Sequence, residues 1–387
     1  MMSKKSPQLR FEGFTDDWEQ RKLGELTTSF SGGTPSAGNS SYYKGDIPFI
    51  RSGEINSDKT ELFLTEAGLK NSSAKMVSVG DILYALYGAT SGEVGISQIN
   101  GAINQAILAI KPCDGYNSHF LMQWLKLQKQ KIIDKYLQGG QGNLSGSIVK
   151  NLVLNVPSYE EQEKIGSFFK QLDETIALHQ RKLDLLKEQK KGFLQKMFPK
   201  NGSKVPELRF AGFADDWEER KLSDIADRFD NLRVPITASE RKSGDTPYYG
   251  ANGIQDYVEG FTHDGEFILV AEDGANDLKN YPVQYVNGKV WVNNHAHVLQ
   301  GKNTITDNKF LMNSIKNFNI EPFLVGGGRA KLNADVMMKL NILLPTFDEQ
   351  EKIGSFFKQL DDTIALHQRK LDLLKEQKKG FLQKMFV

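Results

Sequence analysis

A near-perfect internal repeat constrains this chain more than any other feature. Residues 161–198 read EQEKIGSFFKQLDETIALHQRKLDLLKEQKKGFLQKMF, and residues 349–386 repeat them with one change, Asp362 in place of Glu174. A shorter repeat, residues 7–26 and 206–225, matches at 13 of 20 positions, including LRF, DDWE and RKL. Self-similarity at a long offset indicates a duplicated architecture. We therefore expect the chain to build one conserved frame twice.

Two dissimilar inserts separate the repeats. They comprise residues 27–160 (134 residues) and 226–348 (123 residues). The order predicts a globular domain over 1–160, a long helix over 161–198, a linker over 199–205, a second globular domain over 206–348 and a second long helix over 349–387. Since the chain begins and ends at equivalent points of the two copies, we expect a circular, pseudo-twofold arrangement.

The 38-residue repeat has the pattern of a long helix. Apolar residues recur at spacings of four and three, prolines precede both copies, and Pro199 follows the first. About 35 residues would form a rod of about 50 Å. The residues expected at a helix–helix interface are Ile165, Phe169, Leu172, Ile176, Leu183, Leu186, Ile353, Phe357, Leu360, Ile364, Leu371 and Leu374.

A circular chain would pack these two helices antiparallel as a coiled coil. His179 and His367 would then lie near the middle, where a polar seam residue can fix register; a catalytic or ligand role is the alternative. The exposed face is repeated too, since Lys187, Gln189 and Lys191 recur in the second copy. Either the duplication is recent, or each copy presents the same surface to an identical partner.

Both inserts show a mixture of strand and helix patterns. Strands are expected at 46–50, 81–87, 103–110 and 152–156, and at 266–270, 289–292, 297–300 and 340–344; helices are expected at 118–137 and 308–320. A glycine-rich loop follows each helix, at 138–146 and 325–332. The shared order predicts one α+β fold with divergent loops.

Composition excludes several classes of protein. Lys and Arg total 49 against 48 Asp and Glu, so no whole-molecule field draws the chain to nucleic acid or membrane. The lone Cys113 excludes an internal disulfide framework and a multi-cysteine zinc site. We recognise neither a secretory signal nor an apolar run of membrane-spanning length, and therefore expect a cytoplasmic location.

No strong catalytic signature emerges. The sequence lacks a P-loop, a dinucleotide-binding glycine pattern, an Asn-Pro-Pro motif and a Gly-x-Ser-x-Gly elbow. Glu272, Asp273 and Asp277 could bind a metal, but clustered carboxylates in such a loop are typical of a solvated turn. His295 and His297 share one face of an expected strand, where structural or base-contacting roles compete with zinc binding. We predict no metal site, and binding rather than catalysis.

The LRFxGFxDDWExRKL segments and the PxxxEQEKIGxFFxxLD helices together resemble the DNA-specificity subunits of Type I restriction–modification enzymes, over the whole chain. The resemblance implies two target recognition domains, each reading half of a split double-stranded DNA site, spaced by an antiparallel coil. It implies docking of two methylation subunits and of restriction (translocase–nuclease) subunits. It also implies that S-adenosylmethionine is held on the methylation subunits, with no cofactor on this chain.

Residues that contact DNA are expected mainly in loops with basic or amide side chains. The candidates are Ser31, Thr34, Arg51, Gln138, Gln141, Asn143, Tyr248, Tyr249, Asn252, His295, Arg329 and Lys331. The inserts carry little net charge, +1 for the first and −3 for the second, so we expect the isolated chain to bind DNA weakly. Two alternatives remain, a stand-alone enzyme acting on DNA and a coiled-coil scaffold with two protein-binding domains.

Overall fold

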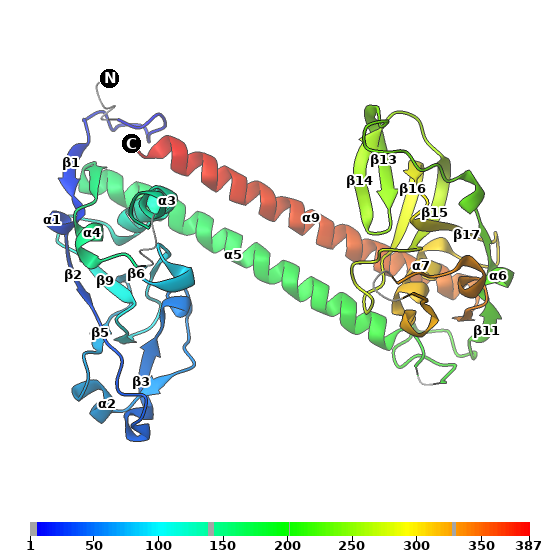
Figure 1. Cartoon of the computed structure of the whole chain (residues 1–387), viewed down its shortest axis with the longest axis horizontal. Coiled ribbons are helices and arrows are strands. Elements are labelled where there is room, and N and C mark those ends of the chain that lie inside the picture. The colour runs from blue at the N-terminus through cyan, green and yellow to red at the C-terminus, as the bar shows by residue number, and fades with distance from the viewer. Residues whose placement is uncertain (1–5, 138–142, 201, 327–329) are drawn as a thin grey trace. The chain divides into compact units, whose positions relative to one another are not determined.

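The chain folds into two compact units. The computed structural model describes residues 6–137, 143–200, 202–326 and 330–387. One unit joins Met1–Gln180 to Lys370–Val387, and the other is Arg181–Arg369. The two ends of the chain, blue and red in Figure 1, therefore belong to the same unit.

The first unit combines two four-stranded sheets with a small two-stranded one. Its strands are β1 (Glu19–Lys22), β2 (Thr27–Ser31), β3 (Tyr43–Ile50), β4 (Phe63–Leu64), β5 (Lys75–Val77), β6 (Ile82–Ala85), β7 (Val94–Ile96), β8 (Gly101–Ile103), β9 (Ile107–Pro112) and β10 (Val153–Val156). Its helices are α1 (Leu23–Leu26), α2 (Glu66–Lys70), α3 (Ser118–Tyr136), α4 (Gly146–Lys150) and the first part of α5 (Tyr159–Lys196). The strand orders are β2-β9-β6-β7, β4-β3-β8-β5 and β1-β10.

The second unit joins the corresponding strands in one six-stranded sheet. Its strands are β11 (Glu218–Lys221), β12 (Ala226–Arg228), β13 (Ser243–Gly250), β14 (Gly253–Val258), β15 (His263–Ala271), β16 (Val283–Val292), β17 (Ala296–Gly301) and β18 (Asn341–Leu344). Its helices are α6 (Leu222–Ile225), α7 (Asn308–Asn317), α8 (Ala334–Met337) and most of α9 (Phe347–Met385). The orders are β12-β17-β15-β16-β13-β14 and β11-β18.

The two units share one strand topology. In the second unit, β16 pairs antiparallel with β15 and then, at Trp291 and Val292, parallel with β13. In the first unit two strands take the place of β16: β7 pairs antiparallel with β6, and β8 pairs parallel with β3. The predicted α+β fold, repeated with divergent inserts, is confirmed.

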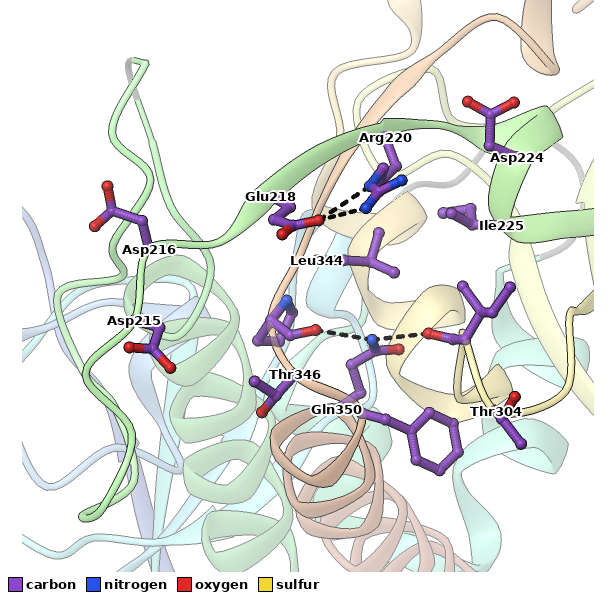
Figure 2. Close-up of a pocket in the computed structure, with 13 residues that line it drawn as sticks. Asp215, Asp216, Glu218, Arg220, Asp224, Ile225, Thr304, Leu344, Thr346 and Gln350 are labelled. Carbon is purple, nitrogen blue, oxygen red and sulfur yellow. Dashed lines mark hydrogen bonds and ion pairs between the residues drawn. The ribbon is translucent and has the colours of Figure 1, made fainter.

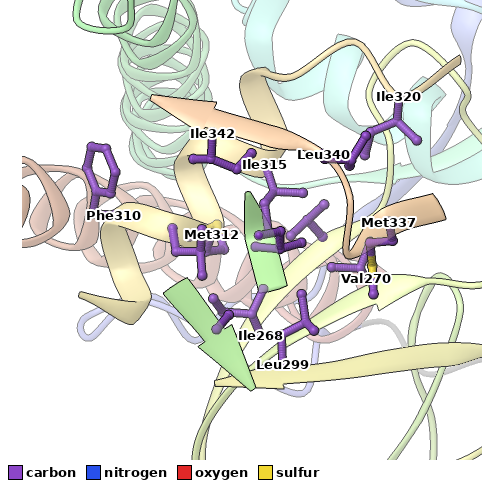
Figure 3. Close-up of a cluster of buried hydrophobic side chains, with 14 of the residues drawn as sticks. Ile268, Val270, Leu299, Phe310, Met312, Ile315, Ile320, Met337, Leu340 and Ile342 are labelled. Atoms are coloured by element: carbon purple, nitrogen blue, oxygen red, sulfur yellow. The ribbon is translucent and has the colours of Figure 1, made fainter. Parts of the chain in front are cut away.

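One helix packs on the main sheet of each unit. In the second unit, α7 begins at Asp307, whose side chain accepts a hydrogen bond from the backbone of Phe310. The buried face of α7 then meets Ile268, Val270 and Leu299 of the sheet (Figure 3). In the first unit, α3 begins in the same way at Asn117 and buries an equivalent apolar face.

The long helices α5 and α9 pair antiparallel within each unit. In the first unit, Phe168 contacts Phe381 edge-to-face, and Asp173 forms an ion pair with Lys378. In the second, Lys190 forms an ion pair with Asp361, and Phe193 contacts Phe356. Rising numbers on α5 therefore meet falling numbers on α9, as expected for antiparallel helices. No helix in the described part of the chain is long and apolar enough to cross a membrane.

The residues expected at the helix–helix interface all lie in buried or half-buried positions. Those that are buried are Ile165, Phe169, Leu183, Leu186, Ile353, Phe357, Leu371 and Leu374. The half-buried ones are Leu172, Ile176, Leu360 and Ile364. Several also pack against the domain cores; Phe169, for example, contacts Phe386.

The short repeat ties each helix to its unit. Arg10 donates two hydrogen bonds to the buried carboxylate of Glu161, and the adjacent Gln162 accepts one from the backbone of Asn117, the N-cap of α3. Arg209, Glu349, Gln350 and Asp307 repeat the same contacts in the second unit. The repeated residues therefore join three elements at one point, which explains in physical terms why both copies retain them.

Candidate functional site

One loop-bearing edge of the main sheet is built in the same way in both units. In the first, the backbone N–H of Leu86, just after β6, donates to the carbonyl of Ala106, and the N–H of Leu144 donates to the carbonyl of Leu86. Asn143 also forms an isolated antiparallel bridge with Tyr87. The end of the first glycine-rich segment is thereby joined to the loop after β6.

The second unit repeats these backbone bonds with different side chains. The N–H of Glu272 donates to the carbonyl of His295, and the N–H of Leu332 donates to the carbonyl of Glu272. Lys331 forms an isolated antiparallel β-bridge with Asp273, just as Asn143 does with Tyr87. Strand pairing extends the correspondence, since Leu108 faces Tyr84 and His297 faces Val270. The equivalent positions are Leu86 and Glu272, Leu108 and His297, Ser31 and Asp230, and Asn143 and Lys331.

At these positions the second unit contains a charged cluster, which we define as Asp230, Arg233, Glu272, His297 and Lys331. Glu272 accepts from Arg233 at 2.7 Å and lies 2.9 Å from the ammonium of Lys331. Asp230 pairs with the Nδ1 atom of His297 at 2.7 Å and also accepts from the backbone of Val298. Because Leu86 and Leu108 occupy the corresponding positions of the first unit, the frame itself does not require these charges.

Hydrogen bonds and ion pairs join the members of the cluster. His297 is almost fully buried, and its two ring nitrogens lie against the Asp230 carboxylate and, at 2.8 Å, the carbonyl of Leu332. Although burial acts to raise the pKa of Asp230 and of Glu272, hydrogen bonds from His297 to the former and from Arg233 and Lys331 to the latter lower both pKa values overall.

Three of these groups lie close enough together to suggest a metal site, since ligand atoms of Asp230, Glu272 and His297 fall within 4.8 Å of one another. The hydrogen bonds argue for an ion network instead. Both ring nitrogens of His297 already have partners, Asp230 and the carbonyl of Leu332, and the Glu272 oxygens accept from Arg233 and Lys331. A cation there would have to displace these partners. Asp277, by contrast, accepts from the backbone of Lys279 and Asn280 and caps its own turn.

The candidates in the first unit lie in different settings. Thr34 is exposed in the SGGTPS loop and donates to the side chain of Gln105, which follows β8. This loop needs glycine, because a Cβ atom on Gly32 would lie 1.8 Å from the carbonyl oxygen of Ile103. Arg51 lies further away in sequence and is bound by Glu54 and Glu61. Gln138 and Gln141 lie outside the described residues.

The candidates in the second unit are equally varied. His295 and Lys331 belong to the loop edge, where Nδ1 of His295 lies 2.6 Å from Asp273. Tyr249 is half-buried, and Asn252 uses its side-chain amide to bind the backbone of Gly274 and Asn276. Arg329 lies outside the described residues. Sequence reasoning missed Asp230 and Arg233, which begin and directly follow a short 3-10 turn (Asp230–Leu232) that gave no signal of its own.

Tyr248 requires a correction. Only 1% of its surface is exposed, and its hydroxyl donates to the carbonyl of Ile236. The guanidinium of Arg241 covers its ring at 4.2 Å. The side chain therefore fills the core, and the expected DNA contact gives way to a packing role.

A pocket recurs where the repeated elements meet. In the second unit it measures about 560 Å³, and Figure 2 shows Gln350 bridging two carbonyl groups at its base while Arg220 pairs with Glu218 at its side. The first unit has a counterpart of about 370 Å³, lined by Arg21, Glu19 and Gln162 at the equivalent positions. Both pockets are carried by the conserved frame rather than by the loop edge.

Comparison with known proteins identifies the family. The model for the Type I restriction modification DNA specificity domain matches residues 15–188 and 214–376. The chain belongs to this family. Each specificity domain of the chain thus spans one globular part and most of one long helix, and the charged cluster falls within the second domain.

Individual relatives agree with this assignment. A putative type I restriction enzyme specificity subunit of Haemophilus influenzae, S.HindORF215P, is 44% identical over 167 residues, which is 43% of this chain and 42% of that protein. The MjaIX specificity subunit of Methanocaldococcus jannaschii is 22% identical over 405 residues, 95% of this chain and 92% of that one. The crystal structure of a Type I system S subunit from M. genitalium shares the specificity-subunit fold, with a TM-score of 0.75, 18% identity and 99% coverage of each chain.

Proposed function

We propose that this chain is the DNA-specificity subunit of a Type I restriction–modification complex and is itself non-catalytic. Its recognition domains would comprise residues 1–160 and 206–348, each reading half of an asymmetric bipartite site. The helices of residues 161–198 and 349–387 would set the spacing, and residues 199–205 would be a linker. The observation that carries the proposal is the loop edge, where one backbone frame holds different side chains in the two units.

The candidate DNA contacts on this edge are Ser31, Thr34, Asn143, His295 and Lys331, with Gln138, Gln141 and Arg329 in the adjoining glycine-rich segments. Arg51, Tyr249 and Asn252 are further candidates; Arg51 pairs with Glu54, and Asn252 binds the backbone of Gly274. Direct reading of bases requires polar side chains that reach into a groove. The differing residues at equivalent positions therefore favour unlike half-sites.

A repeated feature of the long helices supports docking of two methylation subunits. Leu178 and Leu185 on α5 are exposed, and their repeats Leu366 and Leu373 on α9 are exposed as well. Exposed leucines at the same two positions of both helices suit contact with two identical partners, because exposed apolar surface is typical of protein-interaction sites. S-adenosylmethionine would be bound by those methylation subunits, and restriction subunits would join the complex in the cytoplasm.

An exchange of inserts tests the proposal. Residues 226–348 would be replaced by the corresponding insert of a related specificity subunit, and genomic methylation would be mapped in cells that carry the whole operon. One half of the methylated site should change while the other half and the spacer stay the same. A change in both halves, or in neither, would contradict the two-reader arrangement.

The alternative of a stand-alone enzyme has a separate test. The purified chain, incubated with Mg²⁺ and supercoiled plasmid, should leave the plasmid intact. Cleavage or methylation without partner subunits would favour the enzyme. A scaffold without DNA specificity would leave the methylated sequence unchanged in every insert exchange.

A further inference from the structure

We infer that the charged cluster of the second unit is a positioning device, in which Glu272 holds Lys331 in place to contact a DNA phosphate. The inference rests on the proposed function, because the phosphate would belong to the half-site read by the second domain. In this inference Lys331 makes the contact with DNA. The other four members of the cluster, Asp230, Arg233, Glu272 and His297, only position Lys331.

The cluster is not needed to build the fold. The first unit forms the same backbone bonds with Leu86 and Leu108, both buried, where the second has Glu272 and His297. Removing carboxylates from water carries a desolvation penalty, and replacement of a buried ion group by apolar residues is often neutral or stabilising. The charges at this edge therefore call for a reason other than packing.

The cluster places positive charge at its outer end. Arg233 and Lys331 share the carboxylate of Glu272, and Arg233 also lies 3.5 Å from that of Asp230. The side chain of Lys331 is 46% exposed, whereas those of Glu272 and Arg233 are each 15% exposed. The ammonium of Lys331 is therefore the charged group of the cluster that is most exposed to solvent.

Lys331 is held at both its backbone and its side chain. Its N–H donates to the carbonyl of Val325, and the N–H of Val325 donates back to Lys331, which joins the ends of the glycine-rich segment. Glu272 fixes the ammonium, and Arg233 holds Glu272 while donating to the carbonyl of Ala296. An ammonium at the base of a loop suits a phosphate, because lysine contacts phosphate as a point charge.

The test is a double-mutant cycle on the full chain in complex with its methylation subunits. The probe is a duplex that carries the methylated site found in the genome of cells with the operon. One variant is Lys331→Ala. The other gives the cluster the apolar character of the first unit while keeping Lys331, and combines Asp230→Ser, Arg233→Met, Glu272→Leu and His297→Leu.

Each variant should bind the probe about tenfold more weakly than the native complex. Lys331→Ala should also reduce the slope of log affinity against log salt by about 0.9, the value for one lost phosphate contact. Adding Lys331→Ala to the fourfold variant should cause no further loss. Native affinity in the fourfold variant, or losses that add up, would overturn the inference.

Two controls keep the result interpretable. Lys339→Ala removes another exposed cation of the same unit and should leave both affinity and salt slope unchanged. If the fourfold variant fails to fold, Glu272→Gln replaces it as a near-isosteric change that keeps an acceptor but removes the charge. Binding should be several-fold weaker at a temperature where circular dichroism shows the variant to be folded, and native affinity in Glu272→Gln would refute the positioning role.

The outcome separates this inference from the proposed function. A native complex that shows no preference for the probe over a scrambled duplex would contradict the proposed function itself. Specific binding by the native complex together with an inert Lys331→Ala would contradict only the positioning inference.

Discussion

Arg209 donates two hydrogen bonds of 2.7 Å to the carboxylate of Glu349, which lies 140 residues further along the chain and is fully buried. The same fork joins Arg10 to Glu161 in the first unit. Each pair connects the short repeat to the start of a long helix, so that the conserved segments act as clamps and the inserts are free to differ.

Breaking this clamp should destabilise the unit that contains it. Glu349→Gln leaves the guanidinium of Arg209 partly buried without its counter-charge, and we expect a loss of about 3 kcal/mol in the free energy of unfolding. Glu161→Gln should do the same in the first unit. Urea unfolding followed by circular dichroism would measure the loss, with the exposed pair variant Glu218→Gln as control; equal stability of all three would contradict the prediction.

The glycines of the long helices should respond oppositely to alanine. A Cβ on Gly166 would lie 2.4 Å from the side-chain oxygen of Asn117, and one on Gly354 would lie 2.3 Å from that of Asp307. Gly166→Ala should therefore lower the melting temperature by displacing the cap of α3. Gly192→Ala meets nothing within 4 Å and should stabilise α5 by up to about 1 kcal/mol.

Acid should weaken one turn of the first domain in a defined range. Burial opposes ionisation of Glu54, yet hydrogen bonds from Arg51, Glu61 and Thr60 lower its pKa from the ordinary 4.5 to about 2. A lowered folded-state pKa means that the stabilisation is complete above about pH 5 and is lost as the pH falls toward 2. Native protein should exceed Glu54→Gln in stability by about 1–2 kcal/mol at pH 7, and the gap should close near pH 2.

Removal of the aromatic ring of Phe386 should lower the stability of the unit on which this ring packs. Phe386 stacks on Phe120 at 5.1 Å between centroids and meets Trp18 edge-on. Phe386→Ala should cost about 3–5 kcal/mol in the first unit. Phe198→Ala is the matched change in the second unit, where Phe198 stacks on Phe310. Thermal unfolding that shifted the same unit in both variants would contradict the assignment of these rings.

The duplicated frame and its two paired long helices were predictable because sequence repeats and heptad spacing indicate them directly. An apolar residue every three or four positions predicts a helix with one apolar face. Two copies of that helix can each bury this face against the other. The strands at 266–270 and 297–300 were found for a similar reason, since both are apolar and bounded by turn residues.

The hairpin of β13 and β14 escaped prediction. Its sequence, SGDTPYYG followed by GIQDYV, contains a proline and several glycines, and most of β14 is exposed. Besides pairing with β14, β13 pairs in parallel with β16 at Tyr248 and Trp291, a contact that only the folded chain provides. Strands stabilised by tertiary partners carry little local signal.

The charged cluster escaped prediction for a different reason. Glu272 was expected in a solvated turn, but in the fold it is mostly buried beside Arg233, 39 residues away. No local pattern links these two residues, because their contact depends on the turn after β12 meeting the end of β15. Comparison of the two inserts reveals the cluster once backbone bonds show which positions correspond.

The division of the chain into units has a consequence for synthesis. The second unit is a single stretch, Arg181–Arg369, whereas the first also needs Lys370–Val387. A ribosome translates those residues only after the whole of the second unit, and domains generally fold as units during translation. The unit that is translated first is thus the last to be completed. Until Phe386 has been translated, the aromatic surface around Phe120 lacks the ring that packs on it.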